Sequence, residues 1–188
     1  MRLFTCLLLS PATRDAVLSL QSRLKPFGDT VRWSEPESLH LTVSFIGEIA
    51  DPSLLPDVQS ACDEIAQSTT PFRFRVAGAS VFPKRGDIIK TVIATVTDGA
   101  DDWKALVRRS EPWLSPFGAK PENGLAPHVT LGRAKGGETL PELRAAIERE
   151  KTTDCGTQDA TRLVLVESVL TPTGAVYKER GAWAFTGL

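Results

Sequence analysis

The chain has two histidines, and both stand in the same four-residue pattern. Each histidine is followed by an apolar residue, a threonine and a second apolar residue, giving His40-Leu41-Thr42-Val43 and His128-Val129-Thr130-Leu131. In a β-strand, side chains two residues apart project from the same face. Each pattern therefore predicts a strand that presents a histidine and a threonine on one face and buries its apolar residues on the other.

Two such strands facing each other could catalyse phosphodiester chemistry. One neutral imidazole can accept a proton from an attacking water, while the other, protonated, donates a proton to the leaving sugar oxygen. The ordinary imidazole pKa of about 6.5 permits both states near neutral pH. The hydroxyls of Thr42 and Thr130 can donate hydrogen bonds to the non-bridging phosphate oxygens. Because the two motifs are equivalent, the residues alone leave open whether His40 or His128 is the acid.

The pairing of the two motifs is what favours catalysis, since an isolated histidine of this kind would be interpreted as a surface residue or a hydrogen-bonded core residue. We expect no metal ion and no cofactor. Two histidines without closely spaced carboxylates offer too few ligands for a catalytic metal ion. The sequence also lacks the glycine-rich loop with which P-loop enzymes hold nucleotide phosphates.

The composition is that of a folded protein, and we expect one domain of two interleaved lobes over residues 1–188. Apolar residues make up 41% of the chain and charged residues 24%, which excludes the disordered and collagen-like classes. The formal net charge of −1 provides no overall positive field for a long polyanion. A nucleic acid would therefore have to be held by a local patch.

The sequence favours a cytoplasmic monomer with no membrane partner. The three cysteines, Cys6, Cys62 and Cys155, lack the spacing of a zinc site or a redox pair, as expected in a reducing compartment. No apolar run approaches the roughly 18 residues of a membrane span. The apolar residues 3–9 lack a following Ala-x-Ala cleavage site and predict a buried first strand rather than a signal peptide.

Hydrophobic periodicity predicts the order strand, helix, strand, helix, strand in each half of the chain. In the first half we expect strands at 3–9, 39–46 and 72–82, with helices ending near 26 and beginning near 51. In the second half we expect strands at 88–96 and 129–131, with a helix between them that carries Trp103 and Leu114 on its buried face. Thr139 and Glu142 predict a capping box for the next helix. A last strand at 163–170 should turn at 172–174 and pair with 175–177 and 183–185.

This repeated order predicts an internal duplication. His40 and His128 lie on the third element of each half or near it, 88 residues apart. Two lobes related by a pseudo-two-fold axis would bring the two motifs face to face across a groove.

The chain resembles the 2H phosphoesterases, and among them the RNA 2′,3′-cyclic phosphodiesterases, also called 2′-5′ RNA ligases. The paired His-x-Thr-x motifs carry the resemblance, which extends over nearly the whole chain. The other matching segments are Met1 to Phe4, Trp33, Ser44 to Glu48, Phe82-Pro83, Pro127, Gly132-Arg133, Ser168, Leu170, Pro172, Gly174 and Tyr177.

The resemblance implies a bilobal α+β fold in which duplicated antiparallel sheets line a central groove and helices lie outside. It implies hydrolysis of an RNA terminal 2′,3′-cyclic phosphate to a 2′-phosphate, with His40 as the proton donor and His128 as the proton acceptor. The partners would be RNA or oligonucleotide ends and nucleotides. The family also implies the reverse reaction, which joins ends through a 2′-5′ linkage.

Three further residues are predicted to bind substrate: Arg133, Phe82 and Trp33. Strict alternation would put Arg133 on the opposite face from His128, so its reach to phosphate depends on how the strand ends or twists. By the same rule we favour a place in the core for Phe45 over a role as a platform for a base. Trp33 could either pack or stack on a base.

Two positions depart from the family pattern. Residues 88–97 contain no aromatic side chain where an aliphatic-Trp pair is usual, so this segment offers no ring on which a base could stack. Gly132 stands where a small residue such as alanine is expected.

Two other functions remain open on the sequence. The same site could act on a small cyclic phosphate, such as one derived from ADP-ribose. Alternatively, the chain could be a non-catalytic module in which the histidines and threonines only hold the phosphate of an RNA end.

Overall fold

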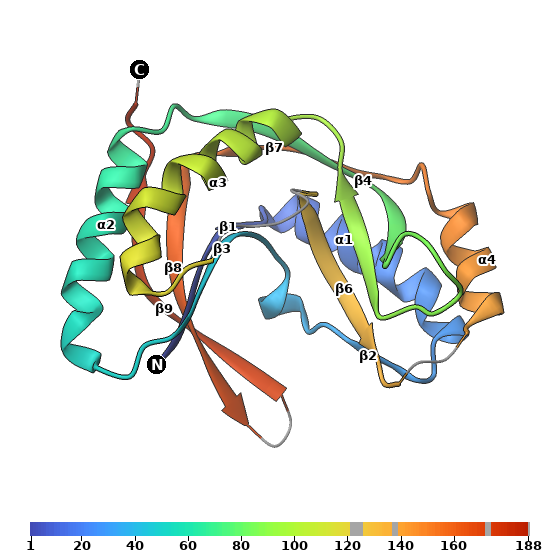
Figure 1. Cartoon of the computed structure of the whole chain (residues 1–188). Coiled ribbons are helices and arrows are strands. Elements are labelled where there is room, and N and C mark those ends of the chain that lie inside the picture. The colour runs from blue at the N-terminus through green and yellow to red at the C-terminus, as the bar shows by residue number, and fades with distance from the viewer. Residues whose placement is uncertain (121–125, 137–138, 172–173, 188) are drawn as a thin grey trace.

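The computed structural model describes residues 1–120, 126–136, 139–171 and 174–187. Within these residues it contains nine antiparallel strands and four α-helices (Figure 1). The helices are α1 (Pro11–Leu24), α2 (Leu55–Gln67), α3 (Ala100–Leu114) and α4 (Pro141–Arg149). The strands are β1 (Arg2–Leu8), β2 (Val31–Trp33), β3 (His40–Glu48), β4 (Phe72–Phe82), β5 (Thr91–Val96), β6 (His128–Ala134), β7 (Asp154–Ala160), β8 (Arg162–Thr171) and β9 (Gly174–Ala184).

The strands form one curved sheet in the order β7-β4-β5-β6-β3-β1-β8-β9, and β2 also pairs with β6. The centre of this order lies between β6 and β3, and four strands extend from it in each direction. The two half-sheets are joined there by the pairing of Leu41 with Val129. The expected α+β fold with antiparallel strands is confirmed, and its two half-sheets are continuous.

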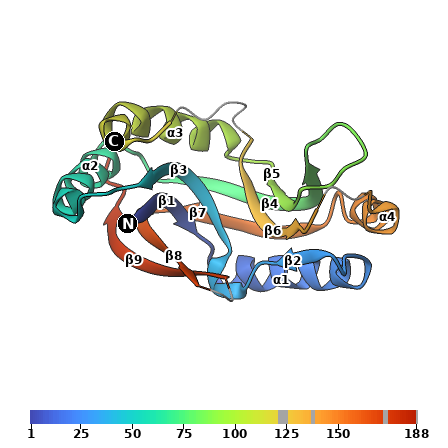
Figure 2. The ribbon, with the colours of Figure 1, turned by 60° about the horizontal axis from the view of Figure 1, so that its bottom comes forward.

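The helices cover the outside of the sheet in two pairs (Figures 1 and 2). Helix α1 packs on β7 and contacts α4, whereas α2 and α3 pack on each other and on β3, β8 and β9. Helix α1 follows β1 in the chain but covers the other half-sheet. The two lobes are therefore interleaved, and each is built from both halves of the chain.

A buried side chain of helix α1 connects β2 with β6, the strand that carries the second histidine. Pro11 begins the helix, and the Ser10 hydroxyl accepts a hydrogen bond from the Thr13 N–H at 3.2 Å, as an N-cap does. Gln21 is 1% exposed, and its side-chain amide donates to the carbonyls of Ser34, at 2.8 Å, and Leu131, at 2.9 Å. These bonds fix the end of β2 and the middle of β6 relative to each other.

Several predicted elements differ in detail from the structure. Strands β2 and β7 were not expected, since β2 has three residues and β7 is mostly polar. The predicted capping box is wrong: Leu140 is the N-cap of α4 and makes no side-chain cap bond. Thr139 instead pairs with Ile88 in an isolated bridge, and Pro141 begins the helix. The predicted turn at 172–174 lies largely outside the described residues.

None of the helices in the described part of the chain is both long enough and apolar enough to cross a membrane.

Candidate active site

The two His-x-Thr motifs lie side by side at the centre of the sheet. Strands β3 and β6 run antiparallel with Leu41 opposite Val129, and both of these side chains are fully buried. In that register His40 is the neighbour of Thr130, and Thr42 is the neighbour of His128. These four half-buried side chains line one cavity of about 340 Å³. The structure therefore brings together the residues predicted to be catalytic.

Each imidazole is oriented by a backbone carbonyl two residues before it. The Nδ1 atom of His40 lies 2.8 Å from the Ser38 carbonyl oxygen, and Nδ1 of His128 lies 2.9 Å from that of Ala126. A carbonyl can only accept, so Nδ1 carries the hydrogen in both rings. Nε2 is then the atom that exchanges protons, and in His40 it lies 3.1 Å from the Thr42 hydroxyl. The two histidines have the same tautomer for the same reason.

Aromatic rings surround His40 and alter its pKa. Phe4 stacks on the imidazole with centroids 4.9 Å apart, and Tyr177 meets it edge-on at 5.6 Å. Burial, with a smaller effect of the nearby His128, lowers the pKa of His40 to about 4, against the raising effect of the hydrogen bond to Ser38. In the free protein His40 is therefore neutral at neutral pH.

Both motif strands contain a β-bulge directly after the threonine. In the β1–β3 pairing, Cys6 is opposite Thr42 and Thr5 is opposite Ser44, so one residue of β3 is extra. In the β5–β6 pairing, Ile93 is opposite Thr130 and Val92 is opposite Gly132, so one residue of β6 is extra. The extra residues are Val43 and Leu131. A bulge of this kind reverses the alternation of faces for the residues that follow.

The bulges turn Phe45 and Arg133 toward the histidines. Phe45 was predicted to lie in the core, and this is wrong: it is 51% exposed and lines the cavity with His40. Arg133 also lines this cavity, although strict alternation would have directed it away. Phe45 and Arg133 occupy equivalent places after the two motifs, five residues beyond His40 and His128.

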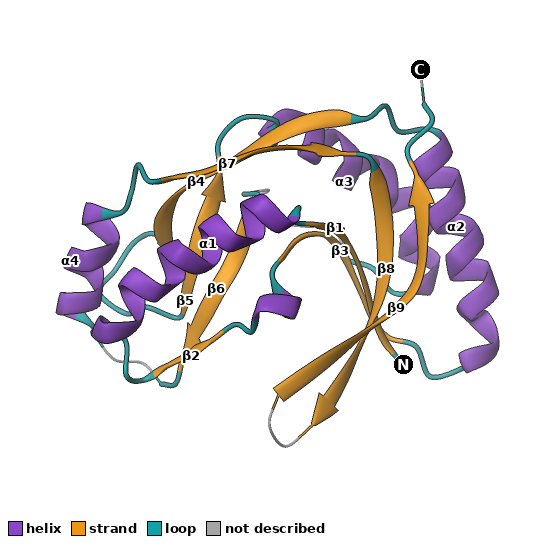
Figure 3. Ribbon diagram, turned by 180° about the vertical axis from the view of Figure 1, so that it is seen from behind, coloured by secondary structure: helices purple, strands orange, loops and turns teal. Residues whose placement is uncertain are grey.

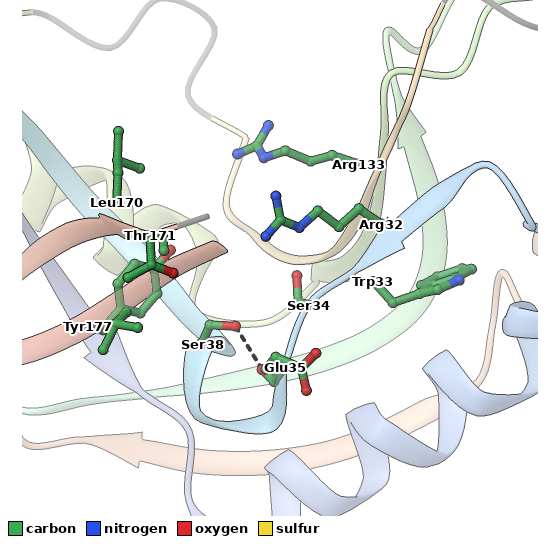
Figure 4. A pocket seen from close by; sticks show the side chains of 11 residues that line it. Arg32, Trp33, Ser34, Glu35, Ser38, Arg133, Leu170, Thr171 and Tyr177 are labelled. Carbon is green, nitrogen blue, oxygen red and sulfur yellow. Dashed lines mark hydrogen bonds between the residues drawn. The ribbon is translucent and has the colours of Figure 1, made fainter. Parts of the chain in front are cut away.

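A second cavity of about 610 Å³ adjoins the first (Figure 4). The β8–β9 hairpin provides part of its wall, and the rest comes from β2, β6 and the segment between β2 and β3. The two cavities share six lining residues: Ser34, Ser38, Arg133, Leu170, Ala175 and Tyr177. They are therefore parts of one groove, of which the smaller part contains both histidines.

Comparison with known proteins assigns the chain to a family. Residues 7–89 match the family model described as LigT like Phosphoesterase. The RNA 2′,3′-cyclic phosphodiesterase of Aeropyrum pernix is 31% identical over 162 residues, which cover 85% of this chain and 89% of that protein. The chain is a LigT-like phosphoesterase. The RNA 2′,3′-cyclic phosphodiesterase of Methanothermobacter thermautotrophicus is 28% identical over 178 residues, which cover 95% of each chain.

Solved structures have the same fold as this LigT-like phosphoesterase. The crystal structure of TT0787 of Thermus thermophilus matches with a TM-score of 0.82 and 24% identity, covering 100% of this chain and 99% of that one. E. coli LigT complexed with 3′-AMP matches with a TM-score of 0.77 and 19% identity, covering 98% of both chains. The α+β fold expected for a 2H phosphoesterase is thus shared over the full length.

The other two predicted substrate-binding residues of this phosphoesterase contact protein groups. The Phe82 ring meets the His128 imidazole edge-on with centroids 4.9 Å apart. Trp33 lines the larger cavity, but its indole points away from Leu170 and Tyr177 (Figure 4) and packs on the core. A Cβ on Gly132 would lie 3.0 Å from this indole and 2.7 Å from Val31 Cγ1, which explains why glycine stands there.

Sequence reasoning did not identify Phe4 and Tyr177 as site residues, and for Phe45 it favoured the core over a base platform. Tyr177 is the single tyrosine of the chain and was noted only as a family match. The carbonyls of Ser38 and Ala126 could not be identified from residue type, because they act through the backbone. In the described segments, no group of three or more His, Cys, Asp or Glu side chains is arranged to hold a metal ion.

Proposed function

We propose that this LigT-like phosphoesterase hydrolyses the 2′,3′-cyclic phosphate at an RNA or oligonucleotide end to a 2′-phosphate, by acid-base catalysis without a metal ion. The observation that carries the proposal is the antiparallel pairing of the two motifs at Leu41 and Val129. This pairing gathers two imidazoles and two hydroxyls in one cavity. Relatives named RNA 2′,3′-cyclic phosphodiesterase support the substrate.

In this proposal His128 is the base and His40 is the acid, as the family resemblance implies. Nε2 of His128 takes a proton from water as the water oxygen bonds to phosphorus. The bond between phosphorus and O3′ breaks, and Nε2 of His40 gives its proton to O3′. The product carries a 2′-phosphate and a 3′-hydroxyl. A second turnover requires the proton gained by His128 to be lost and that of His40 to be restored.

The threonines and Arg133 would stabilise the charge on the phosphate during this step. Thr42 and Thr130 flank the histidines and can donate to the non-bridging oxygens, and such bonds to charged groups are worth about 1.5–3 kcal/mol. Arg133 adds a planar donor that suits phosphate oxygens.

His40 needs the substrate in order to be protonated. Its burial between Phe4 and Tyr177 favours the neutral ring, but a bound phosphodiester places a negative charge beside Nε2 and favours the imidazolium. His40 would therefore act as an acid only in the substrate complex.

Phe45 offers an exposed ring for the terminal base, whereas Phe82 and Trp33 support His128 and β6 rather than the substrate. Stacking of a base on an aromatic ring contributes about 1–3 kcal/mol.

The same acid-base step, with a 5′-hydroxyl attacking the phosphorus in place of water, would give a 2′-5′ linkage.

The test is to incubate the protein with a short RNA that ends in a 2′,3′-cyclic phosphate, in excess EDTA, and to identify the terminal phosphate. We expect a 2′-phosphate and a rate that EDTA does not change. A 3′-phosphate, or activity that EDTA abolishes and a metal ion restores, would contradict the proposal. Conversion only of a small cyclic phosphate derived from ADP-ribose would favour that alternative substrate. Tight RNA binding with no conversion would favour the binding module.

A further inference from the structure

Two arginines lie directly opposite each other beside the catalytic cavity. Arg32 of β2 pairs with Arg133 of β6 in the antiparallel ladder, and both side chains are exposed. Figure 4 shows both guanidinium groups extending into the larger cavity, on the side that faces Leu170 and Thr171. Together the two guanidinium groups make this wall of the groove cationic, and guanidinium binds phosphate oxygens through two parallel hydrogen bonds.

The arginines are the charged side of a cavity that also has an apolar side. Leu170 and Val176 of the β8–β9 hairpin line it and are 70% and 49% exposed. The hairpin extends beyond the rest of the sheet (Figure 3), so these two side chains do not pack into the hydrophobic core. Glu35 is the acidic residue of the lining, and in Figure 4 its carboxylate lies apart from the two guanidinium groups. A cavity with one cationic and one apolar side fits a nucleotide, which has an anionic phosphate and an apolar base face.

The position of Arg32 separates its role from that of Arg133. Arg133 lines both cavities, whereas Arg32 lines only the larger one. A ligand confined to the catalytic cavity would meet Arg133, and a ligand that continues into the larger cavity would also meet Arg32. The chain of an RNA continues in this way from its terminal nucleotide.

We propose that Arg32 binds the phosphodiester that links the terminal nucleotide to the preceding one, next to Arg133 at the cyclic phosphate, with the preceding base against Leu170 and Val176. The substrate class is then an oligonucleotide end, and a mononucleotide cyclic phosphate is a poorer substrate. This proposal rests on the proposed function, since it assumes that the cyclic phosphate occupies the smaller cavity.

Three substrates isolate the contribution of the second phosphate. They are adenosine 2′,3′-cyclic phosphate, the dinucleotide ApA with a 2′,3′-cyclic phosphate, and the same dinucleotide with an uncharged methylphosphonate linkage. We expect the wild type to have a kcat/KM at least about tenfold higher for the charged dinucleotide than for either of the others, because charge-assisted hydrogen bonds to phosphate are lost in both. Arg32→Gln should remove most of this preference. Arg108→Gln, which changes an exposed arginine of α3 that lines neither cavity, should retain it.

A preference that Arg32→Gln leaves intact would overturn the proposal, as would an equal preference for the charged and uncharged dinucleotides. If the wild type hydrolyses none of the three substrates, this result contradicts the proposed function but not the subsite. The subsite is then tested by calorimetric binding of ApA carrying a terminal 2′-phosphate. Binding that is equally tight for charged and uncharged linkages, or that Arg32→Gln does not weaken, would overturn it.

Discussion

The His40 imidazole lies between the rings of Phe4 and Tyr177, and this surrounding determines when it holds a proton. Burial lowers its pKa from 6.5 to about 4. As the pH falls from 6.5 to 4, the unfolded chain binds a proton at this position and the native protein does not. His40 therefore contributes to a loss of stability over this range of pH.

The first prediction concerns the pKa of His40 itself. In an NMR titration, the imidazole of His40 should titrate near pH 4 in the free protein and at a higher pH when adenosine 2′-monophosphate is bound, because the bound anion favours the imidazolium. The chain has only two histidines, so His128→Asn assigns the signals. A free His40 that titrates near 6.5, or a pKa that the nucleotide does not raise, would contradict the role given to it.

The second prediction concerns the two threonine hydroxyls. Thr42→Ala and Thr130→Ala should each lower kcat/KM about 10- to 100-fold, since each removes a hydrogen bond to a charged phosphate oxygen. Thr42→Ser and Thr130→Ser retain the hydroxyl and serve as matched controls that should stay much closer to the wild type. A loss below threefold in the alanine variants would remove the threonines from the mechanism.

At the scale of single elements, the β-bulges of β3 and β6 define the site. The sequence predicted that histidine and threonine would share a face, and the structure has them so. It could not predict the bulges, because the extra residues Val43 and Leu131 are apolar and buried like their neighbours. The consequence was the wrong placement of Phe45. Short β2 and polar β7 were missed for a related reason, since neither has an apolar periodicity.

The third prediction tests how β2 is held against β6. A Cβ at position 132 would lie 2.7 Å from Val31 Cγ1, so Gly132→Ala should destabilise the protein by about 1–3 kcal/mol, as overpacking does. Thermal unfolding measures the change. Val31→Ala should make the same Gly132→Ala change less costly, because the two positions are in contact. Equal costs of Gly132→Ala in both backgrounds would mean that the close approach to Val31 has no energetic effect.

At the scale of the whole molecule, the sequence predicted two interleaved lobes, but which helix covers which half-sheet had to come from the structure. Helix α1 follows β1 and covers the half-sheet that contains β7, whereas α3 covers β3. Periodicity shows which face of a helix is buried and carries no information on which strand buries it. The sheet order and the direct pairing of the two motifs depend on these long-range contacts.

The fourth prediction follows from this interleaving. Neither lobe contains a contiguous half of the chain, so the protein should unfold in one cooperative transition. Tryptophans report on both lobes, with Trp33 on β2 and Trp183 on β9. Denaturation followed by tryptophan fluorescence and by far-ultraviolet circular dichroism should give the same midpoint. Separate midpoints would show that the lobes unfold independently.

The most direct test of the central claim, that the two paired histidines act together as acid and base, is a comparison of four proteins on one substrate. The wild type, His40→Ala, His128→Ala and the double variant are assayed in excess EDTA on an RNA with a 2′,3′-cyclic phosphate, after circular dichroism has confirmed that all four are folded. Each single variant should lose at least about 100-fold in kcat/KM, and the double variant should be little worse than the poorer single one, because the two groups serve one step. A folded single variant that stays within tenfold of the wild type would contradict the claim.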